Sequence, residues 1–436
     1  MKVNIITLGC SKNTVDSENL AGHFAKAGHT VVFDCPKNDA DIVLVNTCGF
    51  IGDAKEESVN TLLEQAAAKA NYNRRHQKDG RTRRLIAFGC LVERYRRDLQ
   101  QSMPEVDAWY GVHQWNEIVE REVADKSRDD FFSLRTTSTP KHYAYLKIAE
   151  GCNRGCSYCA IPLIRGRHQS RPIDDLVAEG RRLVQQGVKE LIIIAQDTTY
   201  YGLDLYGRRC LGDLLERLAT ETGAEWIRLH YTYPRSFPLD AIEVMRRHDN
   251  ICNYIDIPLQ HINSRILSSM QRGIDREGTL QLLRHFREQM PDVTIRTTLI
   301  VGYPGEGEKE FQELKDFVRE AQFDRMGCFA YSLEEGTPAE ILGDPVTEQE
   351  KARRVGELMA LQDEISLAKN QARVGREYRV LIDRREGDYY VGRTEYDSPE
   401  VDEEILVEAT RVLRPGTFYQ VRITQALEHD LYGMIV

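Results

Sequence analysis

The sequence predicts an α/β protein in three parts: an N-terminal doubly wound parallel sheet, a central partial β/α barrel and a small C-terminal β-barrel. Short apolar strands alternate with helical segments in the first third and again in the middle of the chain, which is typical of parallel sheets covered by helices. The last part instead holds short strands separated by turn residues, the pattern of a small barrel. A length of 436 residues suits about three domains.

The first part, residues 1–126, is expected to form the doubly wound sheet. Its predicted strands lie at 3–8, 31–33, 42–46, 85–88 and 108–110. We expect the first helix to begin with Thr14 as its N-cap, to carry Asp16 and Glu18 in its first turn and to end before Gly28. The alanine-rich, charged segment at 53–77 predicts a helix with a solvated outer face.

The second part, residues 143–371, follows a polar linker at 127–142 that has little periodicity. Six predicted strands alternate with helices here, at 143–149, 191–195, 226–231, 254–257, 293–301 and 326–331. This alternation indicates a partial β/α barrel, and polar residues just after its strands are the candidates for an active site. A long helix at 348–372 leads out of it.

The third part, residues 372–436, resembles the TRAM domain, a small barrel often used to bind RNA. Its five predicted strands lie at 378–383, 388–394, 405–408, 418–424 and 431–436. It carries nine Arg, no Lys and thirteen Asp or Glu, and seven of these acids lie between Glu395 and Glu408 without a base. RNA binding requires a basic surface, so we expect the acidic module to bind a basic protein instead. The alternative is that the acids only keep the surface soluble.

Composition indicates which partners and which cellular compartment to expect. The net charge of −10 disfavours indiscriminate binding to nucleic acid phosphates. The N-terminal apolar run is too short for a signal peptide, and the longest apolar run, 191–195, cannot span a bilayer. We therefore expect a cytoplasmic protein with no membrane partner. In that reducing compartment, ten cysteines indicate metal binding or catalysis more often than disulfides.

The stretch that organises the chain holds three cysteines within eight residues, Cys152, Cys156 and Cys159. Gly151 and Gly155 let the backbone fold around a centre, and the spacing suits a 4Fe-4S cluster better than a zinc site. Such a cluster normally takes four thiolates, and no fourth cysteine lies nearby. One iron is therefore left open to chelate a small molecule. A zinc knuckle or chance clustering is the alternative.

The C-x3-C-x2-C spacing with Tyr158 before the last cysteine resembles the radical S-adenosylmethionine (SAM) superfamily. The resemblance implies that the cluster reduces SAM and releases a 5'-deoxyadenosyl radical. It also implies SAM-contacting positions. These are Tyr158 at the cluster, Gln196 and Asp197 for the amino group, and Ile300 and Gly302 for the ribose and adenine. Arg296 is a candidate for the SAM carboxylate, with an internal ion pair as the alternative.

Three further cysteines, Cys10, Cys48 and Cys90, each follow a predicted strand of the first part. Carboxyl ends of parallel strands share one sheet edge, so these thiols are expected to converge, although pattern alone also allows small buried cysteines. The motifs Gly-Cys-Ser-Lys-Asn at 9–13, Asn-Thr-Cys at 46–48 and Gly-Cys at 89–90 resemble the methylthiotransferases. That resemblance implies a second 4Fe-4S cluster on these three cysteines, again with an open iron. Cys35, Cys210, Cys252 and Cys328 match no ligand position of the family and are interpreted as structural.

Two motifs favour one branch of that family. The segments at 8–13 and 255–261 resemble the branch that modifies an aspartate of the small-subunit ribosomal protein at the decoding centre. The implied reaction uses SAM twice, to methylate a sulfur at the first cluster site and to abstract a hydrogen from the aspartate β-carbon, which then takes the methylthio group. Arg165-Gly166-Arg167 also matches the family, without a role that the sequence assigns. The segment at 305–308 departs from the family's usual Gly-Glu-Thr.

The resemblance further implies an electron donor such as flavodoxin or ferredoxin, and a sulfur donor. A tRNA adenosine methylthiotransferase is the alternative with the same ligands, although the acidic third part argues against tRNA as a partner. A non-catalytic iron-sulfur electron carrier or cluster scaffold is the alternative from another class. Two incomplete cysteine triplets argue against it, because a carrier normally protects its cluster with four ligands.

Overall fold

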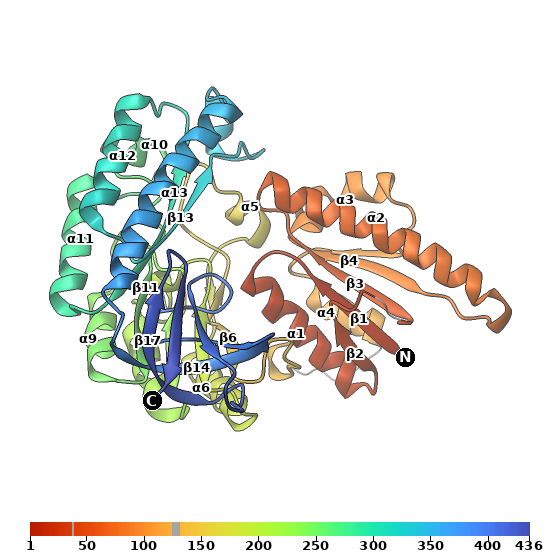
Figure 1. Cartoon of the computed structure of the whole chain (residues 1–436). Coiled ribbons are helices and arrows are strands. Elements are labelled where there is room, and N and C mark those ends of the chain that lie inside the picture. The colour runs from red at the N-terminus through yellow and green to blue at the C-terminus, as the bar shows by residue number, and fades with distance from the viewer. Residues whose placement is uncertain (37–38, 124–130) are drawn as a thin grey trace. The chain divides into compact units, whose positions relative to one another are not determined.

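The structure is a computed structural model that describes residues 1–36, 39–123 and 131–436 (Figure 1). It has two compact units, and each is described by itself. Unit 1 comprises Met1–Thr139, Glu150–Asn153 and Ala160–Arg167, and unit 2 comprises Pro140–Ala149, Arg154–Cys159 and His168–Val436. The cysteine loop at 152–159 thus belongs partly to each unit. The division between Thr139 and Pro140 lies within the predicted linker at 127–142, whose residues 127–130 lie outside the described part of the chain.

Unit 1 contains a five-stranded parallel sheet in the order β2-β1-β3-β4-β5, which confirms the predicted doubly wound arrangement. The strands are β1 (Lys2–Thr7), β2 (Thr30–Phe33), β3 (Ile42–Thr47), β4 (Arg84–Gly89) and β5 (Ala108–Tyr110). The main helices are α1 (Ser11–Lys26), α2 (Gly52–Arg75) and α3 (Cys90–Ser102). Alternate residues of β3 point to opposite faces of the sheet and belong to two hydrophobic cores. Leu44 lies in one core with Phe24 of α1, and Val43 lies in the other with Leu62 of α2.

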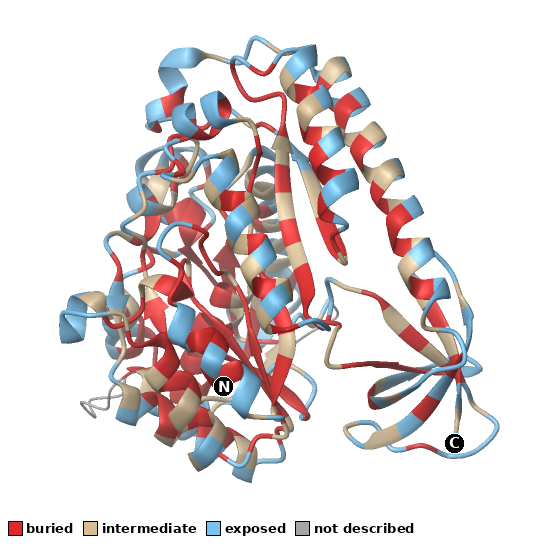
Figure 2. Cartoon of the chain, turned by 90° about the vertical axis from the view of Figure 1, so that its left-hand side faces the viewer, coloured by how far each residue is buried: buried red, intermediate tan, exposed pale blue. Residues whose placement is uncertain are grey.

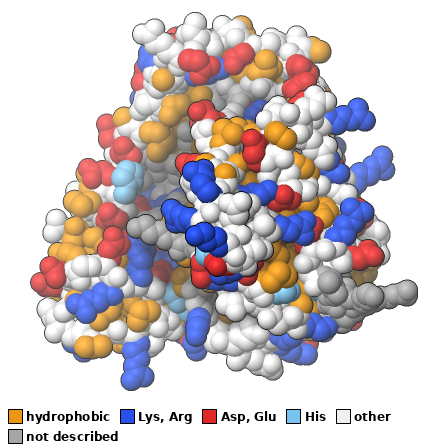
Figure 3. All heavy atoms as spheres, turned by 90° about the vertical axis from the view of Figure 1, so that its right-hand side faces the viewer, with side chains coloured by type: hydrophobic (Ala, Val, Ile, Leu, Met, Phe, Trp, Pro, Cys, Tyr) orange, Lys and Arg blue, Asp and Glu red, His pale blue; other side chains and the backbone are white. Residues whose placement is uncertain are grey.

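The outer side of α2 is solvated, as its composition predicted. Only Ser58, Leu62 and Tyr72 of this helix are buried. On the side of the molecule drawn in Figure 3, basic and acidic side chains are interspersed rather than gathered into a field of one sign.

The predicted start of the first helix was wrong. Helix α1 begins at Ser11, with Cys10 as its extended N-cap residue, so Asp16 and Glu18 lie in the helix interior rather than in its first turn. Both acids are buried, and Glu18 accepts hydrogen bonds from Arg135 at 2.6 Å and from the Ser138 amide at 2.6 Å. These carboxylates bind residues of unit 1 that are distant in the sequence and do not interact with the helix dipole. A local sequence pattern does not distinguish these two roles.

Unit 2 contains a six-stranded parallel sheet in the order β13-β12-β11-β10-β9-β6. The strands are β6 (Tyr143–Lys147), β9 (Glu190–Ile194), β10 (Trp226–Leu229), β11 (Ile251–Asp256), β12 (Thr294–Val301) and β13 (Arg325–Ala330). The helices that alternate with them include α6 (Ile173–Gln185), α8 (Leu211–Glu221), α9 (Leu239–Arg247), α11 (Arg276–Gln289) and α12 (Glu308–Ala321). All six predicted strands are present, and the helices expose one side while the strands are mostly buried (Figure 2).

The C-terminal module is a closed barrel in the order β14-β15-β16-β18-β17, as predicted. Its strands are β14 (Glu377–Glu386), β15 (Tyr389–Arg393), β16 (Glu404–Glu408), β17 (Phe418–Ala426) and β18 (Asp430–Ile435). Helix α13 (Glu348–Gln371) connects it to the sheet, and Asn370 near the helix end donates to the Leu427 carbonyl at 3.1 Å. Val380, Val421 and Leu431 are central to the barrel's own core.

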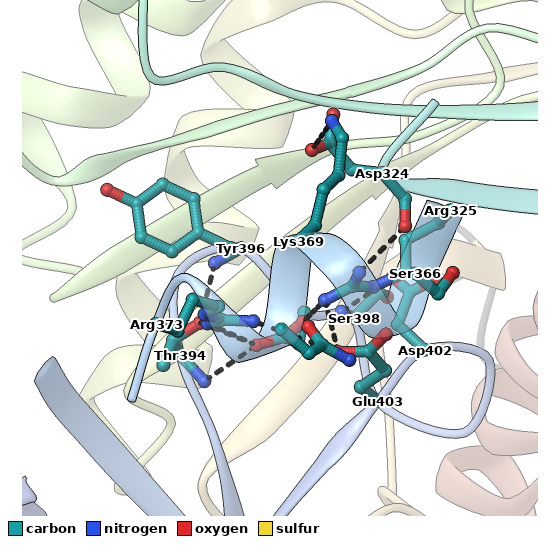
Figure 4. A network of polar contacts seen from close by, with 12 residues as sticks. Asp324, Arg325, Ser366, Lys369, Arg373, Thr394, Tyr396, Ser398, Asp402 and Glu403 are labelled. Carbon is teal, nitrogen blue, oxygen red and sulfur yellow. Dashed lines mark hydrogen bonds and ion pairs between the residues drawn. The ribbon is translucent and has the colours of Figure 1, made fainter. Parts of the chain in front are cut away.

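The acidic run of the barrel packs against the sheet of unit 2. Arg325 of β13 donates to Asp397 at 2.5 Å and pairs with Glu403 at 2.9 Å, within the polar network drawn in Figure 4. Asp402 accepts from Arg296 at 3.2 Å and from the Tyr254 hydroxyl at 2.6 Å.

Two more acids of the run also point inward. Glu400 accepts from the hydroxyls of Tyr143 and Tyr145, and Glu395 accepts from the Asn253 amide. Five of the seven acids between 395 and 408 therefore bind the sheet of the same unit. The sequence-based argument that this run offers its charge to a basic partner was wrong in its physical basis, because these carboxylates are already engaged within unit 2.

In the described part of the chain, no helix combines the length and the apolar character needed to cross a bilayer.

Candidate active site

Cys10, Cys48 and Cys90 follow β1, β3 and β4, which are neighbours in the sheet of unit 1. The backbone around them is held close by glycine: a methyl group at Gly9, whose φ is +90°, would lie 2.8 Å from the Cys48 Cβ. Ser58 of α2 fixes Cys48 by accepting from its amide and donating to its carbonyl, each at 2.9 Å. The three predicted ligands of the first triplet are thus gathered at one sheet edge.

A buried cation adjoins this triplet. Arg165 donates through Nη2 to the Cys90 Sγ at 3.3 Å and to the Asn13 Oδ1 at 2.5 Å. Burial raises the pKa of the Cys90 thiol to about 11, and the nearby guanidinium opposes that rise. Burial also acts against ionisation of Cys10, but Lys12 and Arg165 outweigh it and lower the pKa of this thiol.

The chemistry of this donor set fits an iron-sulfur cluster, whose irons take cysteine thiolates as ligands. Among the described residues, no three His, Cys, Asp or Glu side chains lie close enough to hold one metal ion. Three thiols after neighbouring strands would provide three ligands of a 4Fe-4S cluster and leave its fourth iron without a cysteine. All ten cysteines are unbridged, as metal-binding or buried thiols require.

The second triplet begins in unit 1. Gly151 adopts φ +76°, and a methyl group there would lie 2.6 Å from the Arg167 carbonyl carbon, so only glycine fits. The Cys152 amide donates to the Gly166 carbonyl at 3.1 Å. The first cysteine of the loop is therefore held beside the short helix α5 (Ile161–Arg165).

In unit 2, the Cys156 sulfur contacts polar side chains. The Cys156 Sγ lies 3.4 Å from the Tyr233 hydroxyl and 3.4 Å from Arg272 Nη1. The same Arg272 nitrogen donates to the Tyr158 hydroxyl at 3.3 Å. Burial raises the pKa of Tyr158 far above its ordinary value, so its hydroxyl stays protonated. Arg272 thus donates to the sulfur of Cys156, while the Tyr233 hydroxyl, which donates to the Arg272 carbonyl at 2.9 Å, lies beside it.

The predicted SAM positions after β9 lie next to this group. Asp197 is buried and accepts from Arg154 Nε at 2.6 Å, while Gln196 beside it is half-buried. The Arg154 guanidinium stacks 4.2 Å from the centre of the Tyr233 ring. Asp197 is therefore joined to the cysteine loop through a cation of that loop.

The two SAM positions predicted on the last strands, Ile300 and Gly302, lie in different surroundings. Ile300 and Tyr158 pack on the same apolar cluster, which includes Tyr303 and Tyr331. Gly302 is instead part of the packing of α13: its φ is +77°, and a methyl group there would lie 2.5 Å from the Lys351 Cγ.

Arg296 has the internal ion pairs that the sequence left open as the alternative. Its guanidinium binds Asp256 at 3.1 Å and Asp402 of the barrel at 3.2 Å. This places Arg296 at the contact between sheet and barrel.

Sequence reasoning missed Arg154 and Arg272 as site residues, and it singled out Arg165 only as part of a family motif without an assigned role. Arg154 lies between Cys152 and Cys156, where a charged residue in a loop rich in glycine and cysteine is a usable signal, whereas Arg165 ends the helix α5 that follows the loop. Arg272 lies between α10 (Ser264–Ser269) and α11, and only the fold brings it to Cys156.

Three families match consecutive parts of the chain. The family described as uncharacterized protein family UPF0004 matches residues 2–111, the radical SAM superfamily matches 146–318 and the TRAM domain matches 374–436. The chain is therefore a radical SAM enzyme with a C-terminal TRAM barrel.

Full-length relatives identify the family. The chain is 50% identical to the ribosomal protein uS12 methylthiotransferase RimO of Phocaeicola vulgatus, over 100% of this chain and 99% of that protein. It is 51% identical to the protein of the same name from Christiangramia forsetii, over 99% of this chain and 94% of that protein. The chain belongs to the RimO family of radical SAM methylthiotransferases, as the motifs predicted.

Solved structures support the fold. The radical SAM methyltransferase TsrM from Kitasatospora setae, solved with tryptophan and a SAM analogue, matches with a TM-score of 0.56 at 13% identity, over 88% of this chain and 79% of that one. The cobalamin-dependent SAM radical enzyme OxsB matches with a TM-score of 0.52 at 10% identity, over 81% and 56% of the two chains. At these identities the similarity concerns the fold alone.

Proposed function

We propose that this enzyme adds a methylthio group to the β-carbon of an aspartate in ribosomal protein uS12, the small-subunit protein of the decoding centre. The observation that carries the proposal is the match, along the entire chain, to methylthiotransferases named for uS12. The site supports it, because Cys10, Cys48, Cys90 and Cys152 all belong to one compact unit. Both halves of the proposed chemistry therefore have ligands in unit 1.

The cofactors of the proposal are two 4Fe-4S clusters and SAM. Residues 1–126 hold the auxiliary cluster on Cys10, Cys48 and Cys90, and the loop at 152–159 holds the other cluster. When bound, these groups supply electron transfer, radical generation and sulfur methylation. The residues of the chain supply positioning, since Arg272 donates to the Cys156 sulfur and Arg165 donates to the Cys90 sulfur.

For SAM itself, the proposal assigns Tyr158 and Ile300 to one apolar wall, with Gln196 and Asp197 on the amino group. Gly302 is assigned to the packing of α13, because the Lys351 side chain fills the space beside it and its amide donates to Glu306 at 2.9 Å. Arg296 is assigned to the contact with the barrel, because two carboxylates already bind its guanidinium.

The proposed partners follow from the chemistry. A flavodoxin or ferredoxin supplies electrons, and a separate sulfur donor replenishes the transferred sulfur. Reduced clusters and free thiols suit the cytoplasm, where ribosomal proteins are available. With the acidic run engaged within unit 2, binding of uS12 does not depend on that run.

The test is a reconstitution without oxygen. The enzyme receives SAM and reductant, with uS12 and unmodified tRNA offered in parallel, and products are read by mass spectrometry. A methylthio gain on the uS12 aspartate, abolished by Cys152→Ala or by Cys48→Ala, is the expected result. A methylthio gain on tRNA alone would show that tRNA, and not uS12, is the substrate. Absence of both a product and SAM cleavage would favour a non-catalytic carrier.

A further inference from the structure

Arg165 is the last residue of α5 and is almost fully buried, with 2% of its side chain exposed. Its two terminal nitrogens face different groups. Nη1 donates to Asp16 at 2.8 Å and to Glu150 at 2.9 Å, whereas Nη2 donates to Asn13 at 2.5 Å and to the Cys90 Sγ at 3.3 Å. All five residues belong to unit 1. The carboxylates therefore aim one edge of the guanidinium at the sulfur.

This guanidinium is a permanent and fixed charge. Burial alone would lower the pKa of Arg165, but Glu150, Cys90 and Asp16 raise it well above its ordinary value. The helix that carries it is packed in place, since Ile164 lies in one apolar cluster with Cys90. A buried cation is costly unless it is paired, and here two carboxylates pair with the side of it that faces away from Cys90.

We propose that Arg165 is a positioning residue that sets the reduction potential of the auxiliary cluster on Cys10, Cys48 and Cys90. This inference rests on the proposed second cluster. Hydrogen bonds to a cluster sulfur and positive charge beside it stabilise the more negative, reduced state. Arg165 therefore raises the potential of this cluster. Because Glu150 directly precedes the second cysteine motif, the same ion pair also joins the base of that loop to the auxiliary site.

The test measures the auxiliary cluster alone in the full-length chain. In a parent protein with Cys152, Cys156 and Cys159 replaced by Ala, the midpoint potential is followed by paramagnetic resonance during a redox titration, together with iron content. Arg165→Met is expected to shift the potential to more negative values, and Arg165→Lys is expected to shift it less. The matched control is Arg167→Met, an exposed arginine two residues later in the same segment, which leaves the potential unchanged.

The outcomes separate the possibilities. An Arg165→Met protein with full iron content and an unchanged potential would overturn the proposal. If that variant holds no iron, Arg165→Lys decides: a negative shift against the Arg167→Met control supports the proposal, and no shift overturns it. Absence of iron from the parent protein itself would instead refute the second cluster, and with it this role. The shift is then repeated in the holoenzyme, where both clusters are present.

Discussion

Asp397 is the acid of the barrel whose loss should cost the most. Its side chain is 1% exposed, accepts from Arg325 at 2.5 Å and from the Thr394 hydroxyl at 2.5 Å, and lies 3.6 Å from Arg373. Removing one partner of a buried ion pair typically costs 3–5 kcal/mol, because the other charge is left uncompensated. Glu403 still faces Arg325, so we expect Asp397→Asn to lower the free energy of unfolding by about 3 kcal/mol.

The assay is urea denaturation followed by circular dichroism, with limited proteolysis of the C-terminal barrel as a second readout. The matched control is Glu404→Gln in the same acidic run. Glu404 pairs with Arg384 on the surface, where the two side chains are 36% and 48% exposed, so the change should cost at most about 1 kcal/mol. Equal effects of the two substitutions would refute the conclusion that the run is used inside unit 2.

Two buried titratable groups and one pair of glycines give three further predictions. Burial lowers the pKa of His230 to about 3, so the folded state resists its protonation and stability falls as the pH drops below 6.5. At pH 5 the loss is about 2 kcal/mol, and urea titrations of His230→Gln should show a flatter pH dependence. Burial raises the pKa of Glu403 to about 7, so stability declines as the pH rises from about 4.5 to 7. Glu403→Gln should remove that decline and cost less than Asp397→Asn at pH 8. Gly302→Ala should destabilise by about 2 kcal/mol in thermal melts, because its φ is positive and a lysine chain fills the space, whereas Gly356→Ala, in the open on α13, should stabilise by about 0.5–1 kcal/mol.

The parts of the fold that the sequence predicts are those with local signals. The strands of both sheets and of the barrel are short apolar runs between turn residues, and the structure has all of them. Cysteines placed directly after three strands are brought to one edge by the parallel topology, which makes their convergence a consequence of strand order.

The parts that the sequence does not predict depend on partners far along the chain. From the sequence, the acidic run is interpreted as exposed to solvent because its partners are distant. Arg296 precedes its partner in the run by about a hundred residues, and Arg325 precedes its partner by about seventy. Glu18 reads as a first-turn acid for the same reason, since Arg135 binds it from a separation of 117 residues. The sequence therefore shows the charge of each side chain, but the partner of that charge is known only once the fold is known.

The most direct measurement for the central claim follows one hydrogen atom. Ribosomal protein uS12 labelled with deuterium at the β-carbons of its aspartates is incubated with the reconstituted enzyme, SAM and reductant, and 5'-deoxyadenosine is analysed by mass spectrometry. We predict that 5'-deoxyadenosine gains deuterium in step with the methylthio product, and that Cys156→Ala abolishes both. Formation of the methylthio product with unlabelled 5'-deoxyadenosine would contradict hydrogen abstraction from that carbon.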